Sequence, residues 1–212
     1  MTPIRQAYLV AAGSAVEVLD DPAVAAAWQK PSALTDFSVG GLAAHLAAQV
    51  LFVPATLAKP RPDGDPVGLL GHYERVAWIG ADLDAEVNVN IRSGSEDAST
   101  DGAATVVAQT QAAVRDLTGL LAAEPDDRRV TPPAGPWVLT LDDFLVTRMM
   151  EIVVHSDDLA HSVGIPTPEF PAPVLDPVLD LLTRLAVRRH GTVPVLRALT
   201  RAERAPASIT AF

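Results

Sequence analysis

The sequence predicts an all-α protein. Hydrophobic residues make up 49% of its 212 residues, many of them alanine, and aromatic residues only 5%. This composition suits closely packed helices better than a β-sandwich or a barrel. Apolar residues also recur at helical spacing along most of the chain. The length corresponds to one generous domain, or to one domain with a small appendage.

Charge and hydropathy exclude several classes of function. The formal net charge is -10, and Lys and Arg form no cluster of the kind that holds a phosphate backbone, so no nucleic-acid partner is expected. The first ten residues lack the apolar core of a signal peptide, and no uninterrupted apolar stretch reaches the roughly 18 residues of a membrane span. We therefore expect a cytoplasmic protein without a membrane partner.

The chain contains no cysteine, which excludes a disulfide framework, a thiolate nucleophile of its own and a Cys-based zinc site. Any thiol in its chemistry has to be supplied from outside. Any metal site has to use His, Asp and Glu, which favours zinc or another divalent first-row ion.

Two helices are predicted in the first 60 residues. Apolar residues at i, i+4 and i+7 spacing predict a helix over residues 4–19, ending before Asp20. Ser38 is suited to cap a second helix, which carries His45 and runs to about Pro54.

Residues 65–102 are predicted to contain one helix and one connection. Asp65 and Pro66 resemble an N-cap followed by proline at the first helical position, and a helix after them uses apolar residues as far as Leu83. Helical periodicity then disappears, so residues 87–102 are predicted to be a long exposed connection. Its Ser-Gly-Ser triplet at 93–95 is loop composition and no nucleophile elbow, because no strand precedes it.

Helices continue through the second half of the chain. Residues 103–123 form a strong amphipathic pattern. Thr140 begins the next helix with a pattern that resembles a capping box, and Gly164 follows its end. A further helix starts near Val174 and closes at Gly191, and a short helical piece follows it.

Polar residues that could take part in binding or catalysis interrupt the apolar pattern of the helix predicted between Thr140 and Gly164. Glu151, His155 and Asp158 are spaced by four and three residues, so they share one face of the helix, and Arg148 lies on the same stripe. The flanking residues are apolar, and burying an unpaired polar group costs about 2–7 kcal/mol. A metal ion is one partner that would offset this cost, and an ion pair between Arg148 and Glu151 is the alternative.

His45 strengthens the metal interpretation. It lies in an alanine-rich helix, and polar stripes buried in helical bundles commonly bind metals with ligands donated from facing helices. The other three histidines are left outside the cluster: His72 is assigned to the surface, His161 points away from His155, and His190 resembles a charge at a helix C-terminus.

Three segments resemble the mycothiol-dependent maleylpyruvate isomerase family, within the wider DinB/YfiT-like superfamily. They are residues 28–34 (WQKPSAL), 39–47 (VGGLAAHLA) and 148–160 (RMMEIVVHSDDLA). The resemblance covers residues 1–165 and implies a DinB-like four-helix bundle. Residues 166–212 are then a short helical C-terminal extension packed on that bundle.

The resemblance also implies a site. It assigns His45, Glu151 and His155 as ligands of one divalent ion, usually zinc, with a position left open for water or a thiol. The implied cofactor is mycothiol, a low-molecular-weight thiol whose pKa a metal would lower. Asp158 and Arg148 are the candidate catalytic residues, with Asp158 orienting a ligand or the substrate.

The C-terminal extension differs from that of the characterised isomerase, which carries a larger α/β domain that contributes an arginine to the substrate. Only 48 residues follow Gly164, and none of Arg197, Arg201 and Arg204 can be matched to that arginine. The sequence therefore does not identify maleylpyruvate as the substrate.

The sequence leads to three functional hypotheses. The first is a metal-dependent enzyme that uses mycothiol for isomerisation or S-transfer of a small electrophile. The second is a non-catalytic metal-binding or regulatory bundle, and the third is a hydrolase that activates water on its metal. The low charge of the helices at 4–19 and 103–123 leaves room for a homodimer face.

Overall fold

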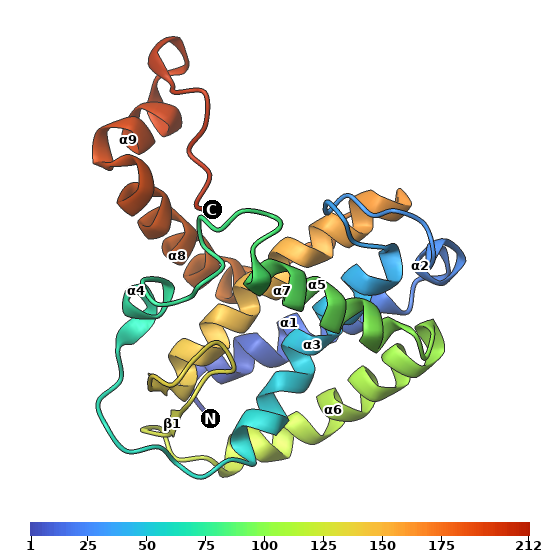
Figure 1. Cartoon of the computed structure of the whole chain (residues 1–212). Coiled ribbons are helices and arrows are strands. Elements are labelled where there is room, and N and C mark those ends of the chain that lie inside the picture. The colour runs from blue at the N-terminus through green and yellow to red at the C-terminus, as the bar shows by residue number, and fades with distance from the viewer.

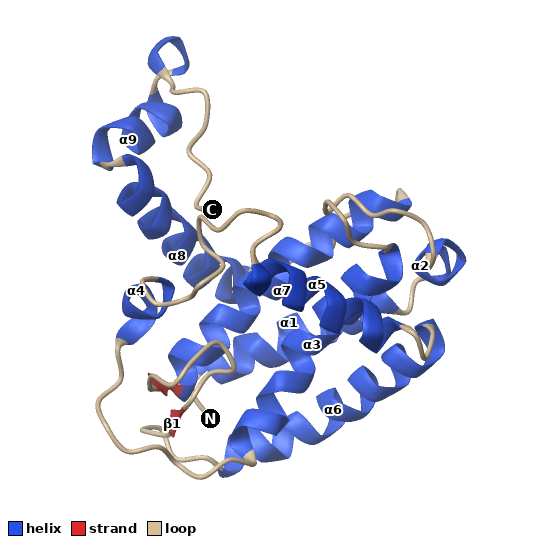
Figure 2. Ribbon diagram, viewed as in Figure 1, coloured by secondary structure: helices blue, strands red, loops and turns tan.

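The computed structural model describes residues 1–212, and it confirms the all-α prediction (Figure 1; Figure 2). Four long helices, α1, α3, α6 and α7, form a bundle in which α1 and α3 each pack against both α6 and α7. Helix α5 lies against α3, and α8 packs on α1 and α7. The elements are α1 (Pro3–Leu19), α2 (Pro22–Ala27), α3 (Val39–Leu57), α4 (Gly68–Tyr73), α5 (Glu86–Ser99), α6 (Ala103–Ala123), β1 (Arg129–Val130), β2 (Leu139–Thr140), α7 (Leu141–Val163), α8 (Ala172–His190), α9 (Thr192–Thr200) and the 3-10 helix η1 (Ala202–Arg204).

A buried arginine joins three of the bundle helices. Arg5 of α1 is fully buried, and its guanidinium donates to the carbonyl oxygens of Leu121, Glu124 and Pro125 at 3.3, 2.6 and 2.7 Å. It also forms an ion pair with Asp142 in the first turn of α7 at 3.1 Å. The carbonyls of Leu121 and Glu124 lie at the end of α6, where the last carbonyls have no partner within the helix, so Arg5 acts as a cap supplied from another helix.

Helix α3 begins as predicted. The Ser38 hydroxyl accepts a hydrogen bond from the Gly41 amide at 2.9 Å, and the helix continues to Leu57, three residues beyond the predicted end, with Pro54 inside it. By length and composition α3 is the one helix that could cross a membrane, but 67% of its most apolar window is buried inside the structure. This is the environment of a central bundle helix.

Two predictions for residues 65–102 are wrong. The predicted helix from Pro66 to Leu83 is reduced to α4, and no side chain caps its start. Gly80 has a φ of 72°, and this left-handed conformation is incompatible with a continuing helix. The segment predicted as an exposed connection is instead the helix α5, of 14 residues.

Contacts with α3 explain why α5 is helical. The Glu96 carboxylate accepts hydrogen bonds from the backbone amide and the hydroxyl of Ser38, both at 2.7 Å. Gly41 allows this close approach, because a Cβ atom there would lie 2.1 Å from a Glu96 oxygen. The Trp28 indole also donates to the Ser99 carbonyl at 3.1 Å. Tertiary contacts therefore stabilise a helix whose own sequence is a poor helix former.

Helix α7 matches its prediction at both ends. The Thr140 hydroxyl accepts a hydrogen bond from the Asp143 amide at 3.0 Å, and Gly164 ends the helix in a left-handed conformation with φ 73°. Between these caps α7 runs through the bundle and packs against α1, α3 and α8. It is therefore the central helix on which the predicted polar stripe lies.

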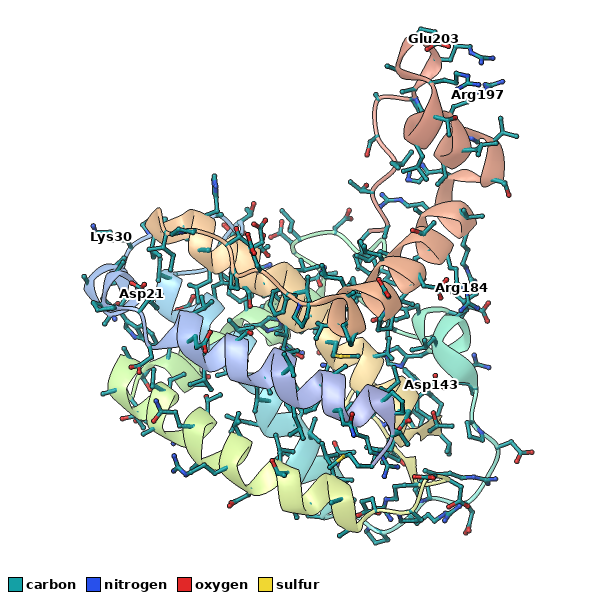
Figure 3. All side chains as sticks on the ribbon, turned by 180° about the vertical axis from the view of Figure 1, so that it is seen from behind. Asp21, Lys30, Asp143, Arg184, Arg197 and Glu203 are labelled. Atoms are coloured by element: carbon teal, nitrogen blue, oxygen red, sulfur yellow. The ribbon has the colours of Figure 1, made fainter.

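The C-terminal segment leaves the bundle as an arm. Helix α8 starts against α1 and α7, whereas α9 packs on the far end of α8 and extends away from the bundle (Figure 1; Figure 3). The chain then returns, and Phe212 lies against Trp78 with ring centroids 4.9 Å apart. Exposed apolar side chains gather on α9, at Val193, Leu196 and Leu199.

The homodimer remains a prediction, as does a domain division at residue 165.

Candidate metal centre

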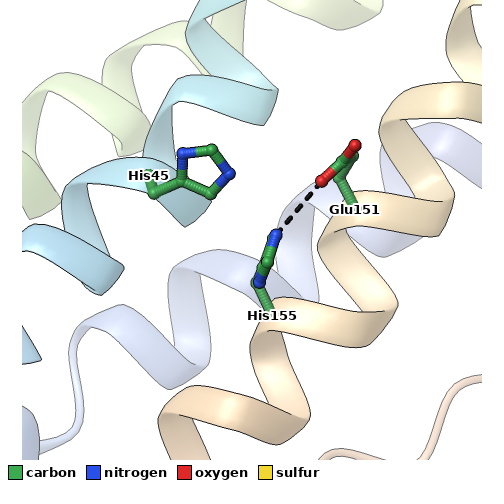
Figure 4. Close-up of side chains that lie close together, drawn as sticks. All are labelled: His45, Glu151 and His155. Carbon is green, nitrogen blue, oxygen red and sulfur yellow. Dashed lines mark hydrogen bonds and ion pairs between the residues drawn. The ribbon is translucent and has the colours of Figure 1, made fainter. Parts of the chain in front are cut away.

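Three potential metal ligands from two helices meet inside the bundle. His45 projects from α3, and Glu151 and His155 project one turn apart from α7. One ligand atom from each residue lies within 4.8 Å of the others. Figure 4 shows one ring nitrogen of His45 directed toward Glu151 and His155 across the space between the helices. The structure therefore brings together the three residues that the sequence singled out.

His155 is held by carboxylates on both sides. Its Nε2 lies 3.1 Å from Glu151 Oε2, and its Nδ1 lies 2.9 Å from Asp158 Oδ2. A histidine whose second nitrogen contacts a carboxylate has the arrangement that orients metal-binding imidazoles in many proteins. The neighbouring Asp157 is exposed and bonds Thr167 instead, at 2.5 Å, so only Asp158 belongs to the polar stripe.

Arg148 does not form the ion pair with Glu151 that was considered as an alternative. Its Nη1 donates to Gln49 Oε1 at 2.5 Å, and its Nε donates to the Thr147 hydroxyl at 3.1 Å. The guanidinium also lies over the Phe144 ring, 5.5 Å from the centroid. No carboxylate lies within 4 Å of it. Arg148 is therefore an unpaired cation beside the cluster.

Burial and mutual interactions separate the pKa values in the cluster. Burial, followed by the positive charge of His155, lowers the pKa of His45 to about 4. Burial alone would lower the pKa of His155, but its hydrogen bonds to Asp158 and Glu151 raise it to about 9. Burial would raise the pKa of Glu151, yet the hydrogen bond from His155 and nearby positive charges lower it to about 2. Without a metal, a protonated His155 thus lies between two carboxylates, and His45 is neutral.

Sequence reasoning missed two residues around His45. Ser95 of α5 lies with its hydroxyl 3.3 Å from His45 Nδ1. Gln49, one turn after His45, has its amide nitrogen 3.5 Å from His45 Nε2. Gln49 could have been found from its i+4 spacing on the same apolar helix, but Ser95 lies in the segment that was predicted to be a loop.

The assignment of His72 to the surface is wrong. Its side chain is buried, and the Trp137 indole donates to its Nδ1 at 2.9 Å. Burial, followed by the charge of Arg148, lowers the pKa of His72 to about 4. The adjacent Tyr73 is also buried, and its hydroxyl has no hydrogen-bond partner. The short helix α4 therefore packs a mainly apolar surface against α7.

The cluster is reachable from solvent. The side chains of His155, Glu151 and Asp158 are 13, 16 and 29% exposed. Two surface concavities lie elsewhere: one between α4 and α8, and one between α7 and the segment around Pro168. The cluster itself is therefore partly open to solvent.

The donor set fits a divalent first-row ion. Two imidazole nitrogens and a carboxylate oxygen are the ligand types of zinc sites that keep an open position. The His155 and Glu151 atoms, 3.1 Å apart, are close to the separation of roughly 3.4 Å expected for two ligands of one tetrahedral ion. The fold and the cluster together define the class: a helical bundle with a His/Glu/His metal-binding arrangement.

Comparison with protein families agrees with this class. The family model described as mycothiol maleylpyruvate isomerase N-terminal domain matches residues 10–160. The chain belongs to this mycothiol-related, metal-binding family of DinB-like bundles, as the segments containing His45 and Glu151 had predicted. No significant match was found among curated proteins or among solved structures.

Proposed function

We propose that the protein is a divalent-metal-dependent enzyme that activates mycothiol for isomerisation or S-transfer of a small electrophilic substrate. The observation that carries this proposal is the convergence of ligand atoms of His45, Glu151 and His155 within 4.8 Å. Membership of a mycothiol-related family supports the choice of thiol. The cysteine-free sequence requires such a thiol to come from outside.

Each polar residue of the cluster has a role in this proposal. His45, Glu151 and His155 hold the ion, for which zinc is the first candidate, and three protein ligands leave a position for the thiol sulfur. When bound, the ion would lower the pKa of that thiol and so supply a thiolate near neutral pH. Asp158 fixes the orientation of His155 through its Nδ1 contact of 2.9 Å.

Arg148 is suited to orient an anionic group of the substrate. Its Nη1 and Nε are held by Gln49 and Thr147, its Nη2 has no hydrogen bond within the chain, and it has no acidic partner. A guanidinium fixed in this way can bind a carboxylate without first breaking an ion pair. We therefore propose that the electrophile carries a carboxylate.

The proposed chemistry balances without an oxidant or a reductant. The thiol gives up its S–H proton, and the sulfur forms a bond to the electrophilic carbon. In S-transfer the proton ends on the leaving group. In isomerisation the sulfur is expelled after the substrate has rotated about the carbon–carbon bond, and the thiol regains its proton.

A cobalt-substituted protein tests the proposal. Adding mycothiol should produce a thiolate-to-metal charge-transfer band, whereas the S-methylated thiol should not. His155→Gln should abolish the band, and His161→Gln, on an exposed part of the same helix, should leave it unchanged. Thiol-dependent turnover in a screen of carboxylate-bearing electrophiles should follow the same pattern. A stoichiometric cobalt site that gives no band with the thiol would refute thiol activation.

The same experiment separates the other two hypotheses. A metal site that hydrolyses esters or amides and gives no thiolate band would indicate the hydrolase. A folded protein that binds no metal would favour a non-catalytic bundle, in which His155 simply bridges Glu151 and Asp158. A cytoplasmic location and a homodimer remain part of the proposal, and light scattering tests the dimer directly.

A further inference from the structure

Ser95 lies against the metal-binding arrangement from a third helix. It belongs to α5, which packs on α3, and its side chain is buried. Its hydroxyl oxygen is 3.3 Å from His45 Nδ1. The opposite ring nitrogen, Nε2, is the one directed toward Glu151 and His155 (Figure 4). Ser95 thus contacts the face of His45 that points away from the cluster.

The single proton of the Ser95 hydroxyl is already used. It is donated to the Ile91 carbonyl oxygen, one turn earlier in α5, at 2.8 Å. A hydroxyl has one donor and two acceptor positions, so Ser95 can only accept a hydrogen bond from His45. The proton of the neutral imidazole therefore belongs on Nδ1.

Gln49 leads independently to the same assignment on the other side of the ring. Its side-chain oxygen accepts the hydrogen bond from Arg148 at 2.5 Å, so its amide group is the part that faces His45. That amide nitrogen donates to the His45 carbonyl oxygen at 2.8 Å and lies 3.5 Å from His45 Nε2. A donor placed 3.5 Å from Nε2 favours a lone pair on that atom over a second proton.

We infer that Ser95 is a positioning residue that fixes the tautomer of His45, with the proton on Nδ1 and the Nε2 lone pair directed into the cluster. This inference rests on the proposed metal function. It gives Ser95 the same role toward His45 that Asp158 has toward His155, so both imidazoles offer Nε2 to the ion. The orienting groups then come from two different helices, α5 and α7.

Ser93 provides a matched control. It lies two residues earlier in α5, is exposed, and donates to the Val89 carbonyl oxygen at 2.8 Å, the same i−4 pattern as Ser95. Ser93→Ala and Ser95→Ala remove the same type of local hydrogen bond from the same helix. Only Ser95→Ala removes a contact with His45.

The first readout is the histidine tautomer in the metal-free protein, measured by long-range ¹H–¹⁵N NMR at neutral pH. His45 should carry its proton on Nδ1 in the parent protein, in Ser93→Ala and in Ser95→Thr, which retains the hydroxyl. In Ser95→Ala the Nε2-protonated form should become populated. A parent His45 protonated on Nε2, or an unchanged tautomer in Ser95→Ala, would overturn the inference.

The second readout is zinc affinity by competition with a chromophoric chelator. Ser95→Ala should bind about 10- to 100-fold more weakly than the parent, the usual effect of losing a group that orients a metal ligand. Ser93→Ala and Ser95→Thr should stay close to the parent, and the metal-free melting temperatures show that all variants are folded. Equal losses in Ser93→Ala and Ser95→Ala would overturn a specific role. A parent that binds no zinc would refute the proposed function, while the tautomer still tests the Ser95 contact.

Discussion

Replacing His45 by alanine is the most informative perturbation of the proposed metal centre. His45 is the only ligand that α3 contributes, so the variant keeps Glu151 and His155 on α7 and loses the connection between the two helices. Alanine is the best helix former, and α3 is already rich in it, so the helix itself should persist. His45→Ala therefore tests metal binding with little effect on the fold.

The expected size of the effect follows from linkage. An ion that binds only the folded state stabilises it by about 2.7 kcal/mol at a free concentration 100-fold above Kd. For a chain of 212 residues, each kcal/mol corresponds to roughly 2–4 °C in melting temperature. The parent protein should thus gain about 5–10 °C when zinc is added. With two ligands on a single helix, His45→Ala should lose most of this gain.

The assay is thermal unfolding after treatment with a chelator, with and without added zinc, together with elemental analysis of the purified protein. His161→Ala is the control, because His161 is an exposed histidine on α7 outside the cluster. The control should keep both the zinc-dependent gain and the metal stoichiometry of the parent. An equal gain in parent and His45→Ala would refute the three-ligand arrangement.

Three further predictions concern the surroundings of the site and the fold. Asp158→Asn should weaken zinc binding about 10- to 100-fold in a chelator competition, whereas Asp157→Asn, at an exposed position, should not. Arg5→Ala should lower the free energy of unfolding, measured by urea denaturation, by about 3–5 kcal/mol, because it leaves Asp142 and the carbonyls of Leu121 and Glu124 at the end of α6 without their partner; a loss below about 1 kcal/mol would contradict this capping role. Gly164→Ala should cost about 1–2 kcal/mol in the same assay, because its φ of 73° is strained for a residue with a Cβ atom; an unchanged stability would refute that explanation.

The sequence was most informative where a helix carries its own boundary signals. Helix α7 has a threonine cap at Thr140 and a left-handed glycine at Gly164, so its limits and its polar stripe could both be predicted. The same holds for α6, whose periodic apolar face and following Pro125 define residues 103–123. In these elements, local preference and tertiary packing favour the same structure.

Helix α5 could not be predicted because its stabilising contacts are not local. Its buried positions include Ser95 and Ser99, four residues apart, and small polar residues give no hydrophobic periodicity. This face is held against α3 by non-local contacts, among them the Glu96–Ser38 hydrogen bonds that Gly41 leaves room for. A stripe of small residues at i, i+4 spacing was the available signal, but it resembles the composition of a loop.

The residues of the candidate site also differ in whether local sequence signals could predict their positions. Glu151, His155 and Asp158 lie on one helix, so their spacing alone placed them together. Placing His45 beside them also required knowing how a second helix is oriented, and the family resemblance supplied that orientation. Placing Ser95 near the site would have required predicting helix α5. Placing His72 in the interior would have required predicting that α4 packs against α7. Sequence reasoning therefore missed Ser95, which contacts His45 from another helix, and also Gln49, which contacts it from the same helix.

His45 is also the residue that separates a metal site from a structural hydrogen-bond network. Without an ion, His155 satisfies both of its nitrogens with Glu151 and Asp158, so these three residues alone form a self-sufficient network. His45 adds nothing to that network: it is neutral at physiological pH because burial lowers its pKa to about 4, and its Nε2 has only the Gln49 amide at 3.5 Å as a donor. A lone pair directed at a carboxylate and a second imidazole, with no close hydrogen-bond donor, is well satisfied by a cation. The geometry around His45 therefore favours metal binding over a purely structural role.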